Sequence, residues 1–133
     1  MGIVKLMRVA AIVAVVLLAL VEVFQIALAL GAPLGKAAWG GRHQGVLPTR
    51  LRISSGVAAV LVYPLVIFLV LAASDLIETT LDAGTRKMGM WVLTALFALG
   101  ALANLASRSK PERIWGPVSL GIAISCALIA RGI

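Results

Sequence analysis

The chain has 133 residues, of which 62% are hydrophobic and 13% are charged, and its formal net charge is +7. Soluble domains are about 45–50% apolar and about 25% charged, so this composition excludes an ordinary soluble enzyme and also a disordered chain. The single cysteine excludes an internal disulfide and a cysteine-rich metal site.

Four long apolar stretches follow one another along the chain. A membrane-spanning helix needs roughly 20 mostly apolar residues, and charged residues bound each of these stretches. The sequence therefore predicts an all-α fold, in which one domain forms an integral membrane four-helix bundle. The predicted spans cover residues 9–31, 53–74, 88–106 and 114–130.

The first span carries an acidic residue, Glu22, with apolar residues on both sides. A charge at the centre of a membrane helix costs on the order of 2.5–3.5 kcal/mol. Such residues usually face the bundle interior and mark an ion, proton or substrate path. Gln25 follows one helical turn later on the same face. The pair is a candidate ligand or proton site, and the alternative is a hydrogen-bond cluster that fixes helix packing.

The segment between the first two spans, residues 31–52, is longer than the 2–8 residues that usually connect packed helices. Its glycines and prolines prevent a continuous helix, yet many of its other residues are apolar. We expect an ordered cap in the membrane interface, with Trp39 at the depth of the lipid headgroups. His43 is a candidate proton shuttle in this cap, and the alternative is a solvated loop histidine. It has no carboxylate partners in the loop, so no metal site is expected.

The second span contains Tyr63 and Pro64 near its middle. By the rise of 1.5 Å per residue, Tyr63 lies at about the depth of Glu22. The proline removes a backbone hydrogen bond and predicts a kink. After this span, Asp75 and Glu78 resemble a capping box, which predicts a short interfacial helix ending at Gly84.

Asn104 lies near the end of the third span, at a depth similar to that of Gln25. A polar path is therefore expected to run from the loops towards Glu22 and Tyr63. The next loop, residues 107–117, is short and basic and carries Trp115. Because four spans place this loop and the cap on the same side, we expect the two loops to touch.

The side that holds these two loops, called here the loop face, carries seven of the Lys and Arg residues and one acidic residue, Glu112. Both termini are expected on the opposite side of the cell (inner) membrane. The Lys and Arg counts favour a cytoplasmic loop face, whereas Lys5 and Arg8 before the first span favour the reverse. The candidate contacts to an anion or lipid are Trp39, Arg42, His43, Arg50, Arg52, Arg108, Arg113 and Trp115. The alternative is membrane anchoring with ordinary surface charge.

The cap reads GAPLG, then AWGG, then VLP, and ends in LR at Arg52; Asn104, Ser107, Ser109, Trp115 and Pro117 follow later. In these motifs the chain resembles a group of small bacterial four-span integral membrane proteins. The likeness implies the four-span architecture and the pairing of the two loops, and it brings no functional residue with it. The chain is also loosely similar to small multidrug-resistance exporters, in which a glutamate of the first span would correspond to Glu22.

Three function classes follow from these features. The preferred hypothesis is a protein that binds a lipid, small molecule or partner through the loop face and the polar layer around Glu22. The second is a proton-coupled transporter that uses Glu22, works as a homo-oligomer and carries a small lipophilic or cationic ligand. The third is a membrane enzyme acting on a lipophilic substrate, whose catalytic residues the sequence does not define. No cofactor motif is present, and nucleic acid is not an expected partner because the cations flank apolar spans.

Overall fold

The structure, a computed structural model, describes residues 1–133 and contains helices but no strands. Four helical rods are long and apolar enough to cross a membrane. The second rod is continuous but composite, because an α-helix, a π-helical segment and a second α-helix follow one another without a break. The rods are α1 (Ile3–Ala29), α2–η3–α3 (Thr49–Val57, Ala58–Val62 and Tyr63–Ala73), α4 (Ala83–Leu105) and η4–α5 (Glu112–Ile114 and Trp115–Gly132).

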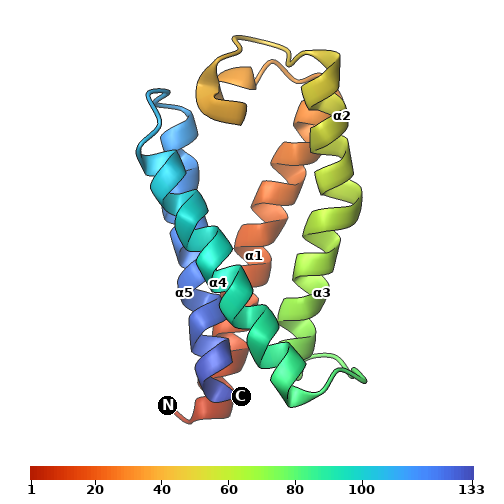
Figure 1. Cartoon of the computed structure of the whole chain (residues 1–133), viewed down its shortest axis with the longest axis vertical. Coiled ribbons are helices and arrows are strands. Elements are labelled where there is room, and N and C mark those ends of the chain that lie inside the picture. Colours follow the sequence, from red (N-terminus) through yellow and green to blue (C-terminus); the bar gives the residue numbers. More distant parts are fainter.

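The rods converge at the end where both termini lie and diverge at the other end (Figure 1). Residues 30–48, called here the cap, fold over the open end. The cap contains two short 3₁₀ turns, η1 (Gly35–Ala37) and η2 (Trp39–Gly41). We refer to the two ends of the bundle as the terminal end and the cap end. The cap end carries the loops of the predicted loop face.

The number and order of the helices agree with the prediction, and the helices extend past the apolar stretches. The second rod begins at Thr49 rather than at residue 53, and α4 begins at Ala83 rather than at residue 88. Polar residues such as Thr49 and Arg50 can also form a helical turn. The length of an apolar stretch therefore predicts where the chain crosses a membrane, and it does not predict where the helix begins or ends.

The predicted short helix over residues 75–84 is absent. Ser74 to Ile77 form a turn, and residues 78–82 have no regular structure. Asp75 has a positive φ of 58° and forms an ion pair with Arg86, with 2.9 Å between the carboxylate oxygen and Nη1. Asp82 instead accepts a hydrogen bond of 2.6 Å from the Thr85 backbone N–H and so caps α4. Gly84 thus lies in the first turn of α4, because a later acid supplies the cap.

The hydrophobic core lies towards the terminal end. On α1 the buried residues Met7, Ala11, Ala14 and Leu18 recur at alternating intervals of four and three residues, which places them along one stripe. The alanines let α3 and α5 pack closely against this stripe. The cap end has only a small separate cluster formed by Leu28, Ala38 and Leu47. The bundle is therefore tightly packed at the terminal end and leaves space beneath the cap.

The predicted irregularity around Pro64 is a π-helical segment over Ala58–Val62. Proline has no backbone N–H, so the regular hydrogen-bond ladder is interrupted in the preceding turn, and π-helical turns absorb such interruptions. The segment ends directly before Tyr63 and so affects the direction in which Tyr63 projects.

Replacing Asp82 by alanine should lower the thermal unfolding midpoint of the purified protein at neutral pH, because α4 loses its N-terminal cap. The hydrogen bonds from Thr85 hold the pKa of the Asp82 carboxyl below its ordinary value of 3.8. The carboxylate therefore stabilises the fold above that value, and its contribution is lost as the pH falls from 3.8 through the lower pKa of the folded state. The difference in midpoint between wild type and variant should shrink over that interval. Glu78→Ala, on the same exposed loop, is the matched control, and equal midpoints for Asp82→Ala and wild type at pH 7 would contradict the assignment.

Candidate functional site

The cap and the loop between α4 and α5 are joined by three hydrogen bonds. The Gly40 backbone N–H donates to the Glu112 carboxylate at 2.7 Å. The Trp115 indole Nε1–H donates to the Ala37 carbonyl at 3.0 Å. The Ser109 hydroxyl donates to the Lys36 carbonyl. The prediction that the two loops touch is therefore confirmed.

The cap is also tied to the first two rods. The Trp39 indole Nε1–H donates to the Ser55 hydroxyl of α2 at 3.0 Å. The Trp115 ring packs against Phe24 of α1, with 4.6 Å between the ring centroids. Both tryptophans thus use their indole N–H groups within the protein, and they fix the position of the cap over the open end.

Within the cap, Gly35 is buried at a point where two backbone segments meet. Its N–H donates to the Gly45 carbonyl at 2.8 Å. A Cβ atom added to Gly35 would lie 2.7 Å from the Gly45 carbonyl oxygen and 2.7 Å from the His43 carbonyl oxygen. Backbone atoms cannot rotate away as a flexible side chain can, so only glycine fits here.

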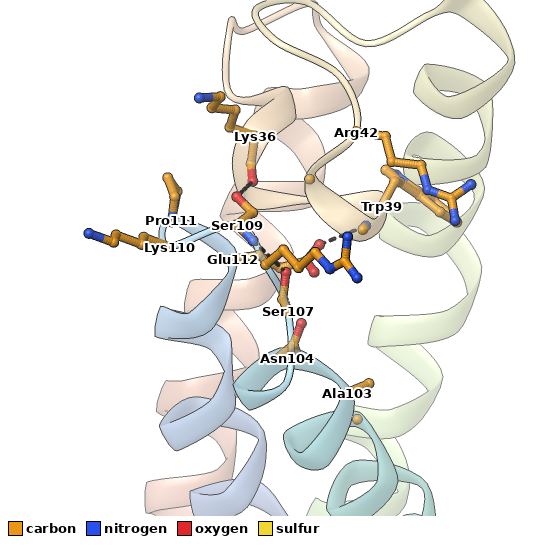
Figure 2. A pocket seen from close by; sticks show the side chains of 14 residues that line it. Lys36, Trp39, Arg42, Ala103, Asn104, Ser107, Ser109, Lys110, Pro111 and Glu112 are labelled. Carbon is orange, nitrogen blue, oxygen red and sulfur yellow. Dashed lines mark hydrogen bonds between the residues drawn. The ribbon is translucent and has the colours of Figure 1, made fainter.

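A surface groove of about 1160 Å³ runs between the cap and the loop that precedes α5 (Figure 2). Four cationic residues line it, and its only acidic residue is Glu112. That carboxylate is buried, is bonded to the Gly40 N–H and forms no ion pair. The groove is therefore strongly positive. Its cationic residues are Lys36, Arg42, Arg108 and Lys110.

Figure 2 shows how these side chains are arranged around the groove. Lys36 and Lys110 extend on one side, Arg42 lies beside Trp39 on the other side, and Asn104 lies at the base. Arg42 thus stands apart from Lys36 and Lys110, with the groove between them.

A smaller cavity of about 230 Å³ lies beneath the cap. Its wall is mostly apolar, with Phe24, Phe97 and Trp115 among the lining residues, and α1, α3, α4, α5 and the cap all contribute to it. Four uncharged polar side chains interrupt the apolar wall: Gln25, Tyr63, Asn104 and Ser119. Trp39, Asn104 and Glu112 line both the groove and the cavity, so the two spaces adjoin.

The polar residues predicted from helix depth are only partly brought together. Gln25, Tyr63 and Asn104 share the cavity wall, whereas Glu22 is not among the residues that line it. Glu22 lies one turn further from the cap at the edge of the buried stripe of α1. Its Oε1 atom and that of Gln25 are buried and have no hydrogen-bond partner.

The predicted loop-face contacts fall into two groups. Trp39, Arg42 and Arg108 line the groove, and Trp115 lines the cavity. The remaining four residues lie outside both spaces: His43, Arg50, Arg52 and Arg113.

Two of these four are committed to backbone carbonyls. Arg52 Nε donates to the carbonyl of Ala29 at the end of α1 at 3.2 Å, and Arg113 Nε donates to the Ser107 carbonyl at 2.8 Å. Both guanidinium groups therefore hold the C-terminal end of a helix in place, α1 for Arg52 and α4 for Arg113. His43 is half-buried, and its Nδ1 atom is buried and has no hydrogen-bond partner.

The contacts predicted from the sequence did not include three residues that line the groove: Lys36, Lys110 and Glu112. Glu112 carried a signal that could have been used, since it is the single acid among seven cations of the loop face. A lone acid in a basic loop often has a specific donor to satisfy, and here the donor is a backbone N–H.

No protein-family model matches the chain, and neither a curated protein nor a solved structure matches it. The chain also contains no group of three or more His, Cys, Asp or Glu residues placed to hold a metal ion.

Gly35→Ala should loosen the cap, because the added methyl group overlaps two backbone carbonyls. Overpacking of this kind costs about 1–3 kcal/mol. Hydrogen exchange of the backbone amides of residues 34–47 should accelerate, while exchange in α5 stays as in wild type. Gly89→Ala is the matched control, since a Cβ at Gly89 would meet no atom within 4 Å. Unchanged exchange in Gly35→Ala would show that the cap does not pack as described.

Glu112→Ala should release the cap from the loop before α5, because the Gly40 N–H loses its acceptor. A hydrogen bond to a charged group contributes about 1.5–3 kcal/mol. The thermal unfolding midpoint should fall, and exchange at Gly40 and Gly41 should accelerate. Glu112→Gln keeps an acceptor oxygen and should restore most of the protection. Equal behaviour of the two variants would argue that the carboxylate does not act through this hydrogen bond.

Proposed function

We propose that the chain is a four-span protein of the cell (inner) membrane, with both termini on one side, whose cap end binds the anionic headgroup of a lipid. Four rods of sufficient length and apolar composition support the membrane placement. Large apolar side chains are exposed along them, among them Val23, Val60, Leu99 and Leu102. Soluble monomers rarely expose apolar patches of this extent, whereas lipid tails would cover them.

The observation that carries the headgroup proposal is the unbalanced charge of the groove. Four cations face a space whose only carboxylate is already bonded to the Gly40 N–H. Arginine and lysine bind phosphate oxygens through charge-assisted hydrogen bonds, and arginine can do so in a bidentate manner. A phosphate group in the groove would be held by Arg42 and Arg108, with Lys36 and Lys110 at the rim.

The position of the cap also supports a headgroup site. A cap with apolar residues and an exposed tryptophan, Trp39, is typical of chain that lies in the membrane interface. The groove opens beside this residue, at the level where phosphates of the lipid leaflet would lie. General attraction to an anionic membrane contributes roughly 1 kcal/mol for each cation near its surface. A specific headgroup site in the groove must therefore bind the lipid more tightly than the same number of cations elsewhere on the protein.

A second candidate function is proton-coupled transport, and one observation favours it. The buried Oε1 atoms of Glu22 and Gln25 lack donors in the helix where a proton site was expected. In this case Glu22→Gln should abolish proton-driven uptake into proteoliposomes while the headgroup site stays intact.

Replacing Lys36, Arg42, Arg108 and Lys110 together by glutamine should reduce retention of phosphatidylglycerol at least about ten-fold, because the phosphate loses several charge-assisted hydrogen bonds. Retention is measured by native mass spectrometry from a mild detergent, with phosphatidylcholine as the neutral-headgroup reference. Competition with free glycerol 3-phosphate separates a lipid headgroup from a soluble phosphate as the preferred ligand.

The matched control removes the same charge from the terminal end, by Lys5, Arg8, Lys87 and Arg131 to glutamine. We expect this control to retain phosphatidylglycerol as wild type does. If both quadruple variants lose the lipid equally, the effect is general charge attraction and the groove is not a headgroup site.

A further inference from the structure

We propose that the groove and the cavity together form one site for a single-chain anionic lipid of the lysophospholipid class. The phosphate lies in the groove, and the hydroxyl-bearing glycerol and the first part of the acyl chain lie in the cavity beneath the cap. This inference rests on the headgroup site proposed above and specifies the ligand that the site selects.

The two spaces adjoin and differ in polarity. Trp39, Asn104 and Glu112 belong to the walls of both, so one ligand that passes these three side chains would occupy both spaces. The groove is lined by charged residues, small polar residues and glycines, whereas aromatic and aliphatic side chains form most of the cavity wall. A lipid with an anionic headgroup and an apolar chain matches this arrangement, with its charged end in the groove and its apolar part in the cavity.

The size of the cavity limits what can enter it. At about 30 Å³ for each water-sized group, 230 Å³ accommodates roughly seven or eight heavy atoms. That is enough for a glycerol unit and the start of one chain. A second acyl chain, joined at the neighbouring glycerol carbon, would compete for the same space.

The polar groups of the cavity wall also favour a lipid with one acyl chain over a lipid with two. Gln25 Oε1 lies on this wall and is a buried acceptor without a donor. The indole N–H groups of Trp39 and Trp115 are bonded to Ser55 and to the Ala37 carbonyl. The Tyr63 side chain lies next to Gln25 on the same wall without donating to Oε1. A free glycerol hydroxyl supplies the missing donor, whereas the ester groups of a diacyl lipid are acceptors only.

Four probes test the proposal on the purified protein in a non-ionic detergent: lysophosphatidic acid, its 2-deoxy analogue, phosphatidic acid and glycerol 3-phosphate. Wild type should bind lysophosphatidic acid about five-fold more tightly than the analogue that lacks only the hydroxyl. Phosphatidic acid should bind more weakly than lysophosphatidic acid.

Two variants assign these preferences to the cavity. Gln25→Leu should bind lysophosphatidic acid and its 2-deoxy analogue with equal affinity. Ala38→Phe, which fills the cavity from the cap, should weaken lysophosphatidic acid at least about ten-fold. Inorganic phosphate, which occupies only the groove, should bind to this variant as it does to wild type, which also shows that the cap is still folded. Thr94→Val and Ala19→Phe are the matched controls, because Thr94 bonds only to the Met90 carbonyl and Ala19 is exposed on α1.

The outcomes separate this inference from the headgroup site. If wild type binds lysophosphatidic acid and its 2-deoxy analogue equally, or if Ala38→Phe does not weaken lysophosphatidic acid, the inference is wrong. The headgroup site still stands in that case, provided that the quadruple variant of the groove loses all four probes. If the quadruple variant binds lysophosphatidic acid as wild type does, both proposals fail.

Discussion

The hydrogen bond between the Gly40 N–H and the Glu112 carboxylate is the contact on which the cap end depends. It joins two segments separated by 72 positions in the chain, and it holds the cap against the loop before α5. It also engages the one negative charge of the groove. Four cations against this one carboxylate leave the groove with an excess of positive charge, and such a space favours an anion.

The space beneath the cap follows from how the rods pack. Small residues on α1 let the rods approach closely at the terminal end, where the main core lies. At the cap end the rods diverge, and the cap with its small cluster of Leu28, Ala38 and Leu47 closes the opening only in part (Figure 1). The cavity between them is thus a consequence of a bundle that is packed at one end and bridged by a folded loop at the other.

Much of this architecture could be predicted from the sequence. The four long apolar stretches predicted four rods. Because successive rods run in opposite directions, the first and third connections were expected at the same end of the bundle. Depth along each helix placed Tyr63 level with Glu22 and Asn104 level with Gln25, and three of these four residues share a cavity wall: Gln25, Tyr63 and Asn104. Glu22 was expected in the same space, but it lies one turn further from the cap than Gln25 and is not part of the cavity wall. The resemblance to small bacterial four-span proteins stays a prediction.

The loops were harder to predict for a related reason. Arg52 and Arg113 look like candidate anion contacts in the sequence, but each is bonded to a carbonyl that only the folded chain brings near. The capping-box pattern of Asp75 and Glu78 is local, and it was overridden because Asp75 pairs with Arg86 and Asp82 caps α4. In both cases the partner of a charged side chain depended on tertiary geometry that spacing does not contain.

We propose that the groove receives a lipid phosphate. The most direct measurement is an experimental structure of the protein in a nanodisc that contains phosphatidylglycerol. We predict density for a phosphate in the groove within hydrogen-bonding distance of Arg42 and Arg108, with the Gly40 N–H still bonded to Glu112. A groove closed by an ion pair from Glu112 to either arginine, with lipid phosphates ordered only elsewhere, would contradict the account.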